Sequence, residues 1–221
     1  MEGYLSLLVH SVGINFRDVL NVLGAYPGDP GPPGADCSGV VYSRCNLSNS
    51  SNDILVGDAV IALASGSFAT TVDVPFSVVS LLCDGVSFEL AASTPSVYMT
   101  VWLALQQACG ASANDTILVH AGSGGIGTAA INVSNVLGAN VWSTAGNVAK
   151  RGYVRALGVH SVCSTRSTAF SEPFHSGVDL ILNSLTSSGM IASSLSCIRT
   201  GGRFVELGKR DIWSTKSMKM E

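Results

Sequence analysis

The chain has 221 residues, enough for one large domain or two small ones with a sizeable hydrophobic core. Hydrophobic residues make up 47% of it, which is typical of a globular protein and not of a disordered one. Only 12% of the residues are charged, and the formal net charge is -3. A chain with so few basic side chains offers no electrostatic surface for a phosphate backbone, so we expect no nucleic-acid partner.

Motifs for metal sites and for several hydrolases are missing from the sequence. The six cysteines and four histidines are spread singly, with no CxxC pair, no HExxH motif and no G-x-S-x-G elbow. We therefore expect neither a metal site nor serine hydrolase chemistry. No uncharged apolar stretch approaches the ~20 residues that span a bilayer, and the first residues lack the basic segment of a signal peptide. We expect no membrane contact and predict an intracellular, reducing location in the cytoplasm, with an organelle not excluded.

Short apolar runs separated by turn residues fill the chain up to about Ala92. Strands are predicted over 5–12, 38–42, 59–63 and 68–74, and a helix over 15–23 that ends at Gly24. Phe16, Val19, Leu20 and Leu23 share one face of that helix. The Pro- and Gly-rich residues 25–34 are predicted to be irregular. These short strands predict a barrel-like, all-β domain over residues 1–92.

The second part of the chain, residues 93–221, alternates strands with helices after a first helix over 98–109. Strands are predicted over 116–120, 140–144, 161–163, 178–182 and 203–207, and helices over 126–137, 149–157 and 190–198. The strands at 116, 140 and 178 are continuous apolar runs, as expected when both faces of a sheet are covered. The pattern predicts a Rossmann-type, doubly wound parallel sheet with five strands, where the common dinucleotide-binding order has six.

A glycine-rich loop joins the first of these strands to the next helix. Residues 120–127 read His-Ala-Gly-Ser-Gly-Gly-Ile-Gly, which matches G-x-G-x-x-G at Gly122, Gly124 and Gly127. Such glycines let the backbone approach a pyrophosphate, whose charge then faces the start of the helix. The cofactor contacts predicted for this loop are Gly122, Ser123, Gly124, Gly125, Ile126 and Gly127. The alternative is a Gly-rich turn without a ligand, and His120 is expected to pack beneath the loop.

The residues after the second strand of this sheet favour NADPH over NAD. NAD-specific sites carry an acidic residue there for the ribose hydroxyl, whereas this chain has Ser143-Thr144-Ala145-Gly146-Asn147 and then Lys150. A 2′-phosphate would meet hydroxyl, amide and ammonium donors at Gly146, Asn147 and Lys150. The missing carboxylate also argues against S-adenosylmethionine. Arg166 is a further cationic candidate, or else a surface arginine without a ligand.

Two further turns follow strands whose carboxyl ends should face the same ligand. Asn183 and Leu185 belong to the turn after the fourth strand and are predicted to contact the cofactor. Glu206 to Arg210 follow the fifth strand, and the alternative for them is a solvated, charged turn.

Several longer motifs together resemble the enoyl reductase domain of type I polyketide synthases and of animal fatty acid synthase. The motifs are residues 15–20 (NFRDVL), 23–30 (LGAYPGDP), 66–70 (GSFAT), the glycine loop, 182–186 (LNSLT) and 201–212 (GGRFVELGKRDI). These domains form the zinc-free, quinone-reductase-like branch of the medium-chain dehydrogenases. The resemblance extends over essentially the whole chain and implies a GroES-like, β-barrel-type domain before the Rossmann domain.

The resemblance implies an NADPH-dependent reduction of an α,β-unsaturated acyl thioester held on an acyl carrier protein, beside neighbouring synthase domains. In the family, the lysine of the Gly-Lys turn after the fifth strand is a candidate proton donor, and that position is Lys209. The tyrosine of the Tyr-Pro-Gly stretch is linked to protonation of the α-carbon in some members, and that position is Tyr26. An ammonium or a phenol can protonate an enolate-like intermediate and stabilise its oxyanion.

The sequence also departs from the family. Zinc-dependent relatives carry a Gly-His-Glu motif where this chain has residues 34–39, Gly-Ala-Asp-Cys-Ser-Gly, so we expect no catalytic zinc. Gly122 stands where the family often has Ala. We expect both domains to be incomplete, because the sixth strand, the return segment and an acidic partner of the lysine are not found after the fifth strand.

Three functions stay open at this point: an enoyl-thioester reductase within a synthase, a non-catalytic or degenerate nucleotide-binding scaffold, and a free-standing, zinc-free quinone oxidoreductase.

Overall fold

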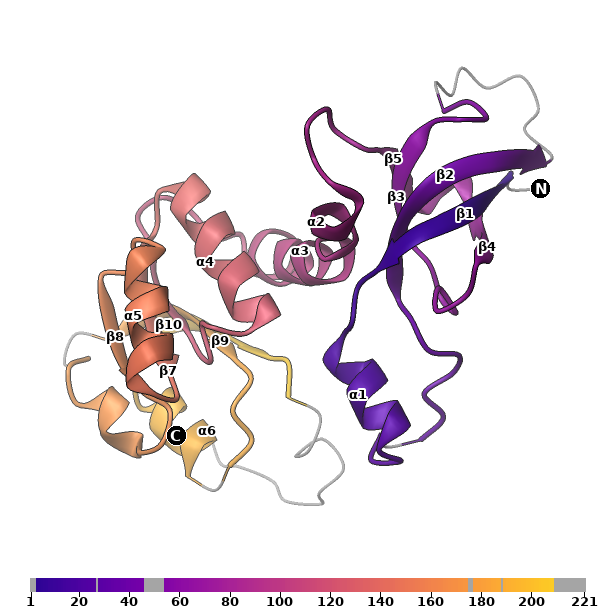
Figure 1. Cartoon of the computed structure of the whole chain (residues 1–221). Helices are drawn as coiled ribbons and strands as arrows, with labels where there is room; N and C mark the ends of the chain where they lie inside the picture. Colours follow the sequence, from indigo (N-terminus) through magenta and orange to yellow (C-terminus); the bar gives the residue numbers. More distant parts are fainter. Residues whose placement is uncertain (1–2, 27, 46–53, 175–176, 188, 209–221) are drawn as a thin grey trace. The chain divides into compact units, whose positions relative to one another are not determined.

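The computed structural model describes residues 3–26, 28–45, 54–174, 177–187 and 189–208. It divides into two compact units, Met1–Met99 and Thr100–Glu221 (Figure 1). The division falls within helix α3 (Pro95–Trp102), a little after the boundary that the sequence suggested.

The first unit is built on a five-stranded antiparallel sheet. Its strands are β1 (Tyr4–Val12), β2 (Asp36–Cys45), β3 (Ala59–Leu63), β4 (Thr71–Pro75) and β5 (Val79–Leu81), in the order β4-β1-β2-β3-β5. Leu5 and Leu7 alternate with more exposed neighbours along β1 and are completely buried against Val41 and Val60. The strand predicted over 68–74 is shorter, because it begins only at Thr71.

Two helices and a short 3-10 helix complete this unit. They are α1 (Phe16–Val22), α2 (Phe88–Ala92) and η1 (Phe76–Val78). Asp18 closes the first turn of α1, since its Oδ2 accepts the Asn15 N–H at 2.8 Å, and Gly24 ends the helix with φ +62°.

The apolar face predicted for α1 does not pack onto the core of this unit. Phe16 is 75% exposed and Leu23 is 70% exposed. Asp18 is instead the buried residue of the helix, and its carboxylate accepts the N–H of Gly34 at 2.9 Å as well as that of Asn15. The Asp18 carboxylate is oriented toward its donors, as a buried charge requires, and the apolar side chains Phe16 and Leu23 are turned outward.

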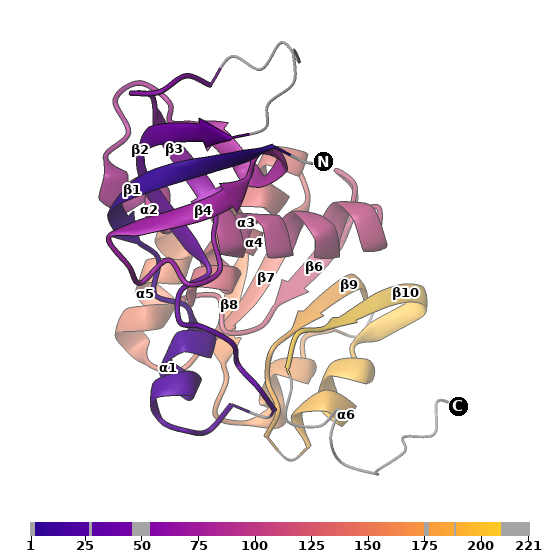
Figure 2. The same ribbon diagram turned by 90° about the vertical axis from the view of Figure 1, so that its right-hand side faces the viewer.

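The second unit is a parallel sheet interleaved with helices, and Figure 2 shows its strands β6 to β10 side by side. After the π-helical turn η2 (Leu103–Ala108) come β6 (Thr116–Val119), α4 (Gly125–Leu137), β7 (Asn140–Ala145), α5 (Val148–Ala156), β8 (Ser161–Ser164), η3 (Thr168–Ser171), β9 (Val178–Asn183), α6 (Met190–Leu195) and β10 (Ile198–Glu206). The helix predicted over 98–109 is thus α3 followed by η2.

The strand order β10-β9-β6-β7-β8 reverses at β6, so the loop after β6 lies at the switch point where open α/β sheets bind ligands. All six residues of β9 are buried, as its continuous apolar run predicts. Phe170, Leu118 and Ile181 form part of the core on one side of the sheet. The predicted fold class, an α/β chain with an antiparallel sheet before a Rossmann-type parallel sheet, is confirmed.

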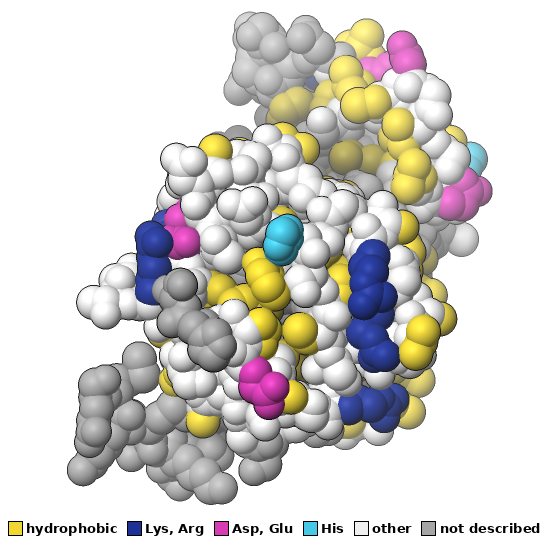
Figure 3. Space-filling model, turned by 90° about the vertical axis from the view of Figure 1, so that its left-hand side faces the viewer, with side chains coloured by type: hydrophobic (Ala, Val, Ile, Leu, Met, Phe, Trp, Pro, Cys, Tyr) yellow, Lys and Arg dark blue, Asp and Glu magenta, His cyan; other side chains and the backbone are white. Residues whose placement is uncertain are grey.

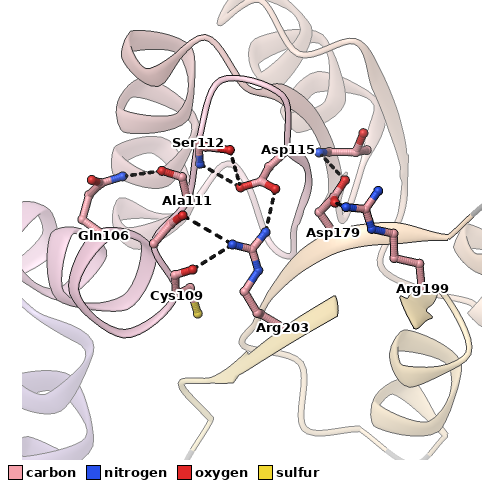
Figure 4. A network of polar contacts seen from close by, with 10 residues as sticks. Gln106, Cys109, Ala111, Ser112, Asp115, Asp179, Arg199 and Arg203 are labelled. Carbon is pink, nitrogen blue, oxygen red and sulfur yellow. Dashed lines mark hydrogen bonds and ion pairs between the residues drawn. The ribbon is translucent and has the colours of Figure 1, made fainter. Parts of the chain in front are cut away.

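Two ion pairs lie near the amino-terminal ends of β6 and β9, away from the carboxyl ends that face the glycine loop (Figure 4). Arg203 of β10 donates to the Cys109 carbonyl at 2.8 Å and to Asp115 Oδ1 at 2.6 Å, and Arg199 pairs with Asp179. Burial raises the pKa of Asp115, but hydrogen bonds from Ser112 and Arg203 outweigh it and hold the pKa below its ordinary value. The network joins the segment before β6 to both β9 and β10.

Candidate functional site

The glycine loop of the second unit joins β6 to α4 and leaves the start of the helix open. Gly124 is the N-cap of α4, with φ -84° and ψ 169°, and the nearest atom to a Cβ built on it is the Ala121 carbonyl oxygen at 3.4 Å. The first N–H groups of a helix have no partner within the helix, and the first turn of α4 carries no acidic side chain. The N–H groups of Gly122 and Gly124 donate to the Thr144 and Ala121 carbonyls, both at 2.9 Å, so the first-turn amides and the positive end of this 13-residue helix are what the loop offers to an anion.

The other two glycines of the motif are there for packing. A Cβ at Gly127 would stand 2.5 Å from the Gly122 Cα, so helix and loop touch backbone to backbone. A Cβ at Gly122 would collide with the Ser143 hydroxyl and stand 3.1 Å from Ile131 Cδ1. The three glycines thus have two roles. Gly124 leaves space for a ligand, while Gly122 and Gly127 let the backbones of the loop and of α4 pack closely against each other.

A buried chain of hydrogen bonds supports the loop from below. Ala121 has φ 52°, in the left-handed region, and its N–H donates to Thr144 Oγ1 at 3.2 Å. Thr144 Oγ1 lies 3.0 Å from His120 Nδ1, and His120 Nε2 lies 2.9 Å from Ser194 Oγ. Because Ser194 gives its proton to the Met190 carbonyl at 2.8 Å, it accepts from Nε2–H, which leaves Nδ1 to accept from Thr144.

His120 is accordingly a structural residue beneath the loop, as the sequence suggested. It is 2% exposed, its ring packs edge-on against Phe170 at 4.9 Å, and burial lowers its pKa from 6.5 to about 4. The imidazole is neutral near pH 7, with the proton on Nε2.

The structure brings together the predicted residues at the end of β7. Asn147 caps α5, its Oδ1 accepting the Lys150 N–H at 2.8 Å, so the start of this helix adjoins the Gly146 turn. Arg166, which follows β8, donates from Nε to the Gly146 carbonyl at 3.0 Å. This bond seats an exposed guanidinium beside the turn, so Arg166 has a partner and is not a loose surface side chain. One cation, Arg166, and the start of α5 therefore adjoin Gly146, and Lys150 is an exposed residue of the first turn of α5.

The carboxyl ends of β9 and β10 are joined through Asn183 and Glu206. Asn183 is completely buried; its Nδ2 donates to Glu206 Oε2 at 2.6 Å and to the Leu185 carbonyl at 3.2 Å, while its Oδ1 accepts the Leu185 N–H at 3.3 Å. Glu206 Oε1 accepts the Gly208 N–H at 2.5 Å. The side-chain polar atoms of Asn183 are thus used within the protein, and they shape the turn that carries Leu185.

Of the two predicted proton donors, Tyr26 lies within the described residues and Lys209 does not. Tyr26 is half-buried in the first unit, in the loop that follows α1. That loop is tied to the helix by the Ala25 N–H, which donates to the Leu20 carbonyl at 2.8 Å, and by Asn21 Nδ2, which donates to the Gly31 carbonyl at 3.3 Å.

Comparison with known proteins places the chain in a family. Residues 125–220 match the family model for zinc-binding dehydrogenases. Polyketide synthase GfsB of Streptomyces halstedii is 38% identical over 212 residues, which cover 95% of this chain and 4% of that protein. The crystal structure of the CurK enoyl reductase superposes with a TM-score of 0.86 at 30% identity, over 96% of this chain and 67% of that one.

The chain belongs to the enoyl reductase domains of polyketide synthases, in the medium-chain dehydrogenase/reductase superfamily. The quinone oxidoreductase of Thermus thermophilus, solved also in complex with NADPH, is 31% identical with a TM-score of 0.76, over 92% of this chain and 65% of that one. The chain spans 4–10% of the length of the first four curated relatives.

The name of the matched family model raises the question of zinc, which the residues present do not fit. Where zinc-dependent members carry their ligand motif, burial and then the Asp36 charge raise the pKa of the Cys37 thiol to about 11, so this buried thiol is protonated near pH 7. The Asp36 carboxylate accepts hydrogen bonds from Asn15 Nδ2 and the Ser96 N–H, both at 2.9 Å. Within the described ranges no three His, Cys, Asp or Glu side chains form a group able to hold a metal.

The surface of this enoyl reductase domain carries little charge. Figure 3 shows one face on which hydrophobic and uncharged side chains are far more widespread than charged ones. In the part of the chain that the structure describes, no helix combines the length and apolar character needed to span a bilayer.

Sequence reasoning missed three residues of the site. Thr144 was read only as one of several donors near the ribose, and neither its bond to the left-handed Ala121 nor the packing of Ser143 against Gly122 was foreseen. Glu206 was noted as following the fifth strand, but its contacts with Asn183 and Gly208 were not. Strand-end position was the available signal in each case, because parallel strands bring their carboxyl ends to one edge.

Proposed function

We propose that this enoyl reductase domain uses NADPH to reduce an α,β-unsaturated acyl thioester carried by an acyl carrier protein of a polyketide or fatty acid synthase. The observation that carries the proposal is the open glycine loop, with Gly124 exposed at the start of α4, in a chain of enoyl reductase ancestry. The neighbouring synthase domains are the expected partners, since the curated relatives are polyketide synthases.

The residues present fit a dinucleotide with a 2′-phosphate. The amides of the first turn of α4, Gly125 to Gly127, would hold the pyrophosphate where the backbone of residues 122–124 lets it approach and no acidic side chain opposes it. Lys150 and Arg166, together with the Gly146-Asn147 turn, would hold the 2′-phosphate, since Arg166 is already seated on the Gly146 carbonyl. Leu185 would contact the nicotinamide end, from a turn that the Asn183 side chain shapes.

When bound, NADPH supplies the hydride that adds to the β-carbon of the substrate. The remaining requirement is one proton at the α-carbon, and Lys209 or Tyr26 is the proposed donor. An ammonium or phenol within hydrogen-bond reach would also stabilise the negative charge on the thioester oxygen before protonation. The β-carbon thus gains the hydride and the α-carbon the proton, so the double bond becomes a single bond and the thioester stays intact.

NADPH oxidation tests the proposal, with crotonyl thioester on pantetheine and on an acyl carrier protein as substrates. The 221-residue chain is assayed with both substrates, and its NADPH affinity is measured separately. We expect NADPH to be consumed in proportion to saturated thioester formed, faster with the carrier protein. NADPH binding without turnover would point instead to a nucleotide-binding scaffold.

A quinone oxidoreductase is the second candidate, favoured by the likeness to the Thermus thermophilus enzyme. A benzoquinone in the same assay separates the two. Reduction of the quinone with no reduction of either thioester would replace the enoyl reductase proposal.

A further inference from the structure

Ala121, at the start of the glycine loop, is the only non-glycine residue with a positive φ among those that the structure describes. Its φ of 52° lies in the left-handed region, which alanine avoids because its Cβ crowds the following carbonyl oxygen. Residues in such conformations persist only where their surroundings hold them, and they are concentrated at functional sites. The contacts of Ala121 therefore identify what keeps the loop in this shape.

Both backbone groups of Ala121 make hydrogen bonds in the left-handed conformation. Its N–H donates to Thr144 Oγ1 at 3.2 Å, and its carbonyl accepts the Gly124 N–H at 2.9 Å. Gly124 is the N-cap of α4, so the second bond sets where the first turn of the helix begins. Rotation of Ala121 out of the left-handed region would redirect both groups and release Gly124 from this position.

Thr144, in β7, holds two successive residues of the loop. Its hydroxyl accepts from Ala121, and its backbone carbonyl accepts the Gly122 N–H at 2.9 Å. Thr144 is completely buried, so its side chain cannot contact a nucleotide bound at the surface of the loop. Any effect of the Thr144 hydroxyl on cofactor binding must therefore pass through the backbone of Ala121.

The Thr144 hydroxyl is oriented by a chain of donors that all point the same way. It accepts from Ala121 and donates to His120 Nδ1 at 3.0 Å. His120 Nε2–H then donates to Ser194 Oγ at 2.9 Å, and the Ser194 hydroxyl donates to the Met190 carbonyl at 2.8 Å. Hydrogen bonds aligned in this way polarise and strengthen one another. Because His120 takes the hydroxyl proton, a lone pair of Thr144 Oγ1 faces the Ala121 N–H.

From these contacts we propose that Thr144 is a positioning residue for cofactor binding, which holds Ala121 in the left-handed conformation and so places the first-turn amides of α4. The inference rests on the proposed function, in which those amides bind the pyrophosphate of NADPH. An alanine without the hydroxyl would populate the left-handed region about tenfold less. The apparent affinity falls with that population, because only molecules with a correctly shaped loop bind.

Three variants separate the hydroxyl from the conformation that it holds. Thr144→Val removes the hydroxyl and keeps the shape of the side chain, whereas Thr144→Ser keeps the hydroxyl. The third variant combines Thr144→Val with Ala121→Gly. Glycine adopts a positive φ without the steric penalty, so this double variant recovers the conformation of the loop without recovering the hydrogen bond.

Calorimetric titration with NADPH, NADH and adenosine 2′-monophosphate is the main test. We expect Thr144→Val to weaken NADPH and NADH binding alike, by about tenfold, since both carry the pyrophosphate. Adenosine 2′-monophosphate has no pyrophosphate and should bind as it does to the parent. Thr144→Ser and Ala121→Gly alone should stay within about threefold of the parent, and the double variant should recover most of the loss.

Steady-state kinetics with crotonyl pantetheine give a second readout. In Thr144→Val the KM for NADPH should rise by about tenfold, while kcat at saturating NADPH changes by less than about threefold, because bound NADPH selects the correctly shaped loop. Thr116→Val makes the same substitution at the other end of β6 and is the matched control, with affinities like those of the parent.

Ala121→Val reaches the same conformation from the other side if Thr144→Val does not fold. A β-branched side chain is still less compatible with a positive φ than alanine is. This variant should weaken both dinucleotides and leave adenosine 2′-monophosphate binding unchanged. Parent-like affinity for the dinucleotides in Ala121→Val would overturn the inference.

The outcomes separate the two proposals. A parent that binds neither dinucleotide overturns the proposed function, and the role of Thr144 with it. A parent that binds NADPH but reduces no thioester overturns the proposed reaction, while the titrations still decide the role of Thr144. Parent-like dinucleotide affinity in Thr144→Val overturns that role alone. Equal losses for all three nucleotides, following the loss of thermal stability and without rescue by Ala121→Gly, show a merely structural role and also overturn it.

Discussion

The backbone of Gly122 lies directly against the hydroxyl of Ser143, so the loop after β6 and the strand β7 share a space that has no room for a methyl group. The Ser143 hydroxyl donates to the Val119 carbonyl at 2.8 Å and is therefore held in that position. This contact accounts for a glycine where related domains often have alanine.

The two positions should be coupled in stability. Gly122→Ala is expected to lower the free energy of unfolding by about 2 kcal/mol through overpacking, and Ser143→Ala by about 1 kcal/mol through the lost hydrogen bond. The double variant should lose about 1 kcal/mol less than the sum, because the alanine methyl group takes the place of the missing hydroxyl. Urea unfolding of the four proteins measures this, and additive losses would contradict the contact.

The position of Gly124 predicts a charge-specific effect on cofactor binding. Gly124→Asp places a carboxylate where the pyrophosphate is proposed to lie and should abolish NADPH binding. Gly124→Ala is the matched control: its Cβ has ordinary contacts only, so affinity should fall by a few-fold at most. Calorimetric titration distinguishes them, and unchanged affinity in the aspartate variant would remove the loop from the site.

Arg166 beside Gly146 and Lys150 in the first turn of α5 predict a selectivity effect. Lys150→Glu and Arg166→Glu should each weaken NADPH binding by about tenfold or more while NADH binding changes little, because only NADPH carries the 2′-phosphate. Arg155→Glu makes the same charge change in the last turn of α5, at its other end, and should leave the NADPH/NADH ratio unchanged. Equal losses for both nucleotides in the Lys150 variant would contradict the assignment.

Burial of neutral His120 makes stability depend on pH in a defined direction. The pKa of His120 is about 4 in the folded chain and 6.5 ordinarily, so between these values the unfolded chain binds a proton that the folded chain does not. The contribution of neutral His120 to the free energy of unfolding is complete above pH 6.5. It declines as the pH falls toward 4, by up to about 1.4 kcal/mol per pH unit. His120→Gln removes it, so urea unfolding of the variant should vary less between pH 7 and 5. Parallel curves for parent and variant would argue against a buried neutral imidazole.

Local patterns predicted the second unit well. The apolar runs of β6 and β9 sit in a regular β/α alternation, and β9 is buried over its whole length, so sequence and environment point the same way. The loop glycines were recognised because their spacing reflects backbone geometry that few other residues allow.

Contacts between distant residues were not predictable in the same way. Asn183 and Glu206, or His120 and Ser194, meet only because parallel strands align their ends, and no local pattern records the partner. The helix α1 was predicted, but the orientation of Asp18 was not, because Asp18 finds its second donor at Gly34, beyond the helix.

Strand β10 is anchored at two levels along its length, by Arg203 to the Cys109–Asp115 segment and by Glu206 to Asn183. These anchors are three residues apart, or roughly 10 Å along an extended strand. To slide by one step against β9, the strand would have to break both at once, although it has a hydrogen-bonded neighbour on one side only among the described strands. Its register is consequently locked by side chains as well as by the backbone ladder.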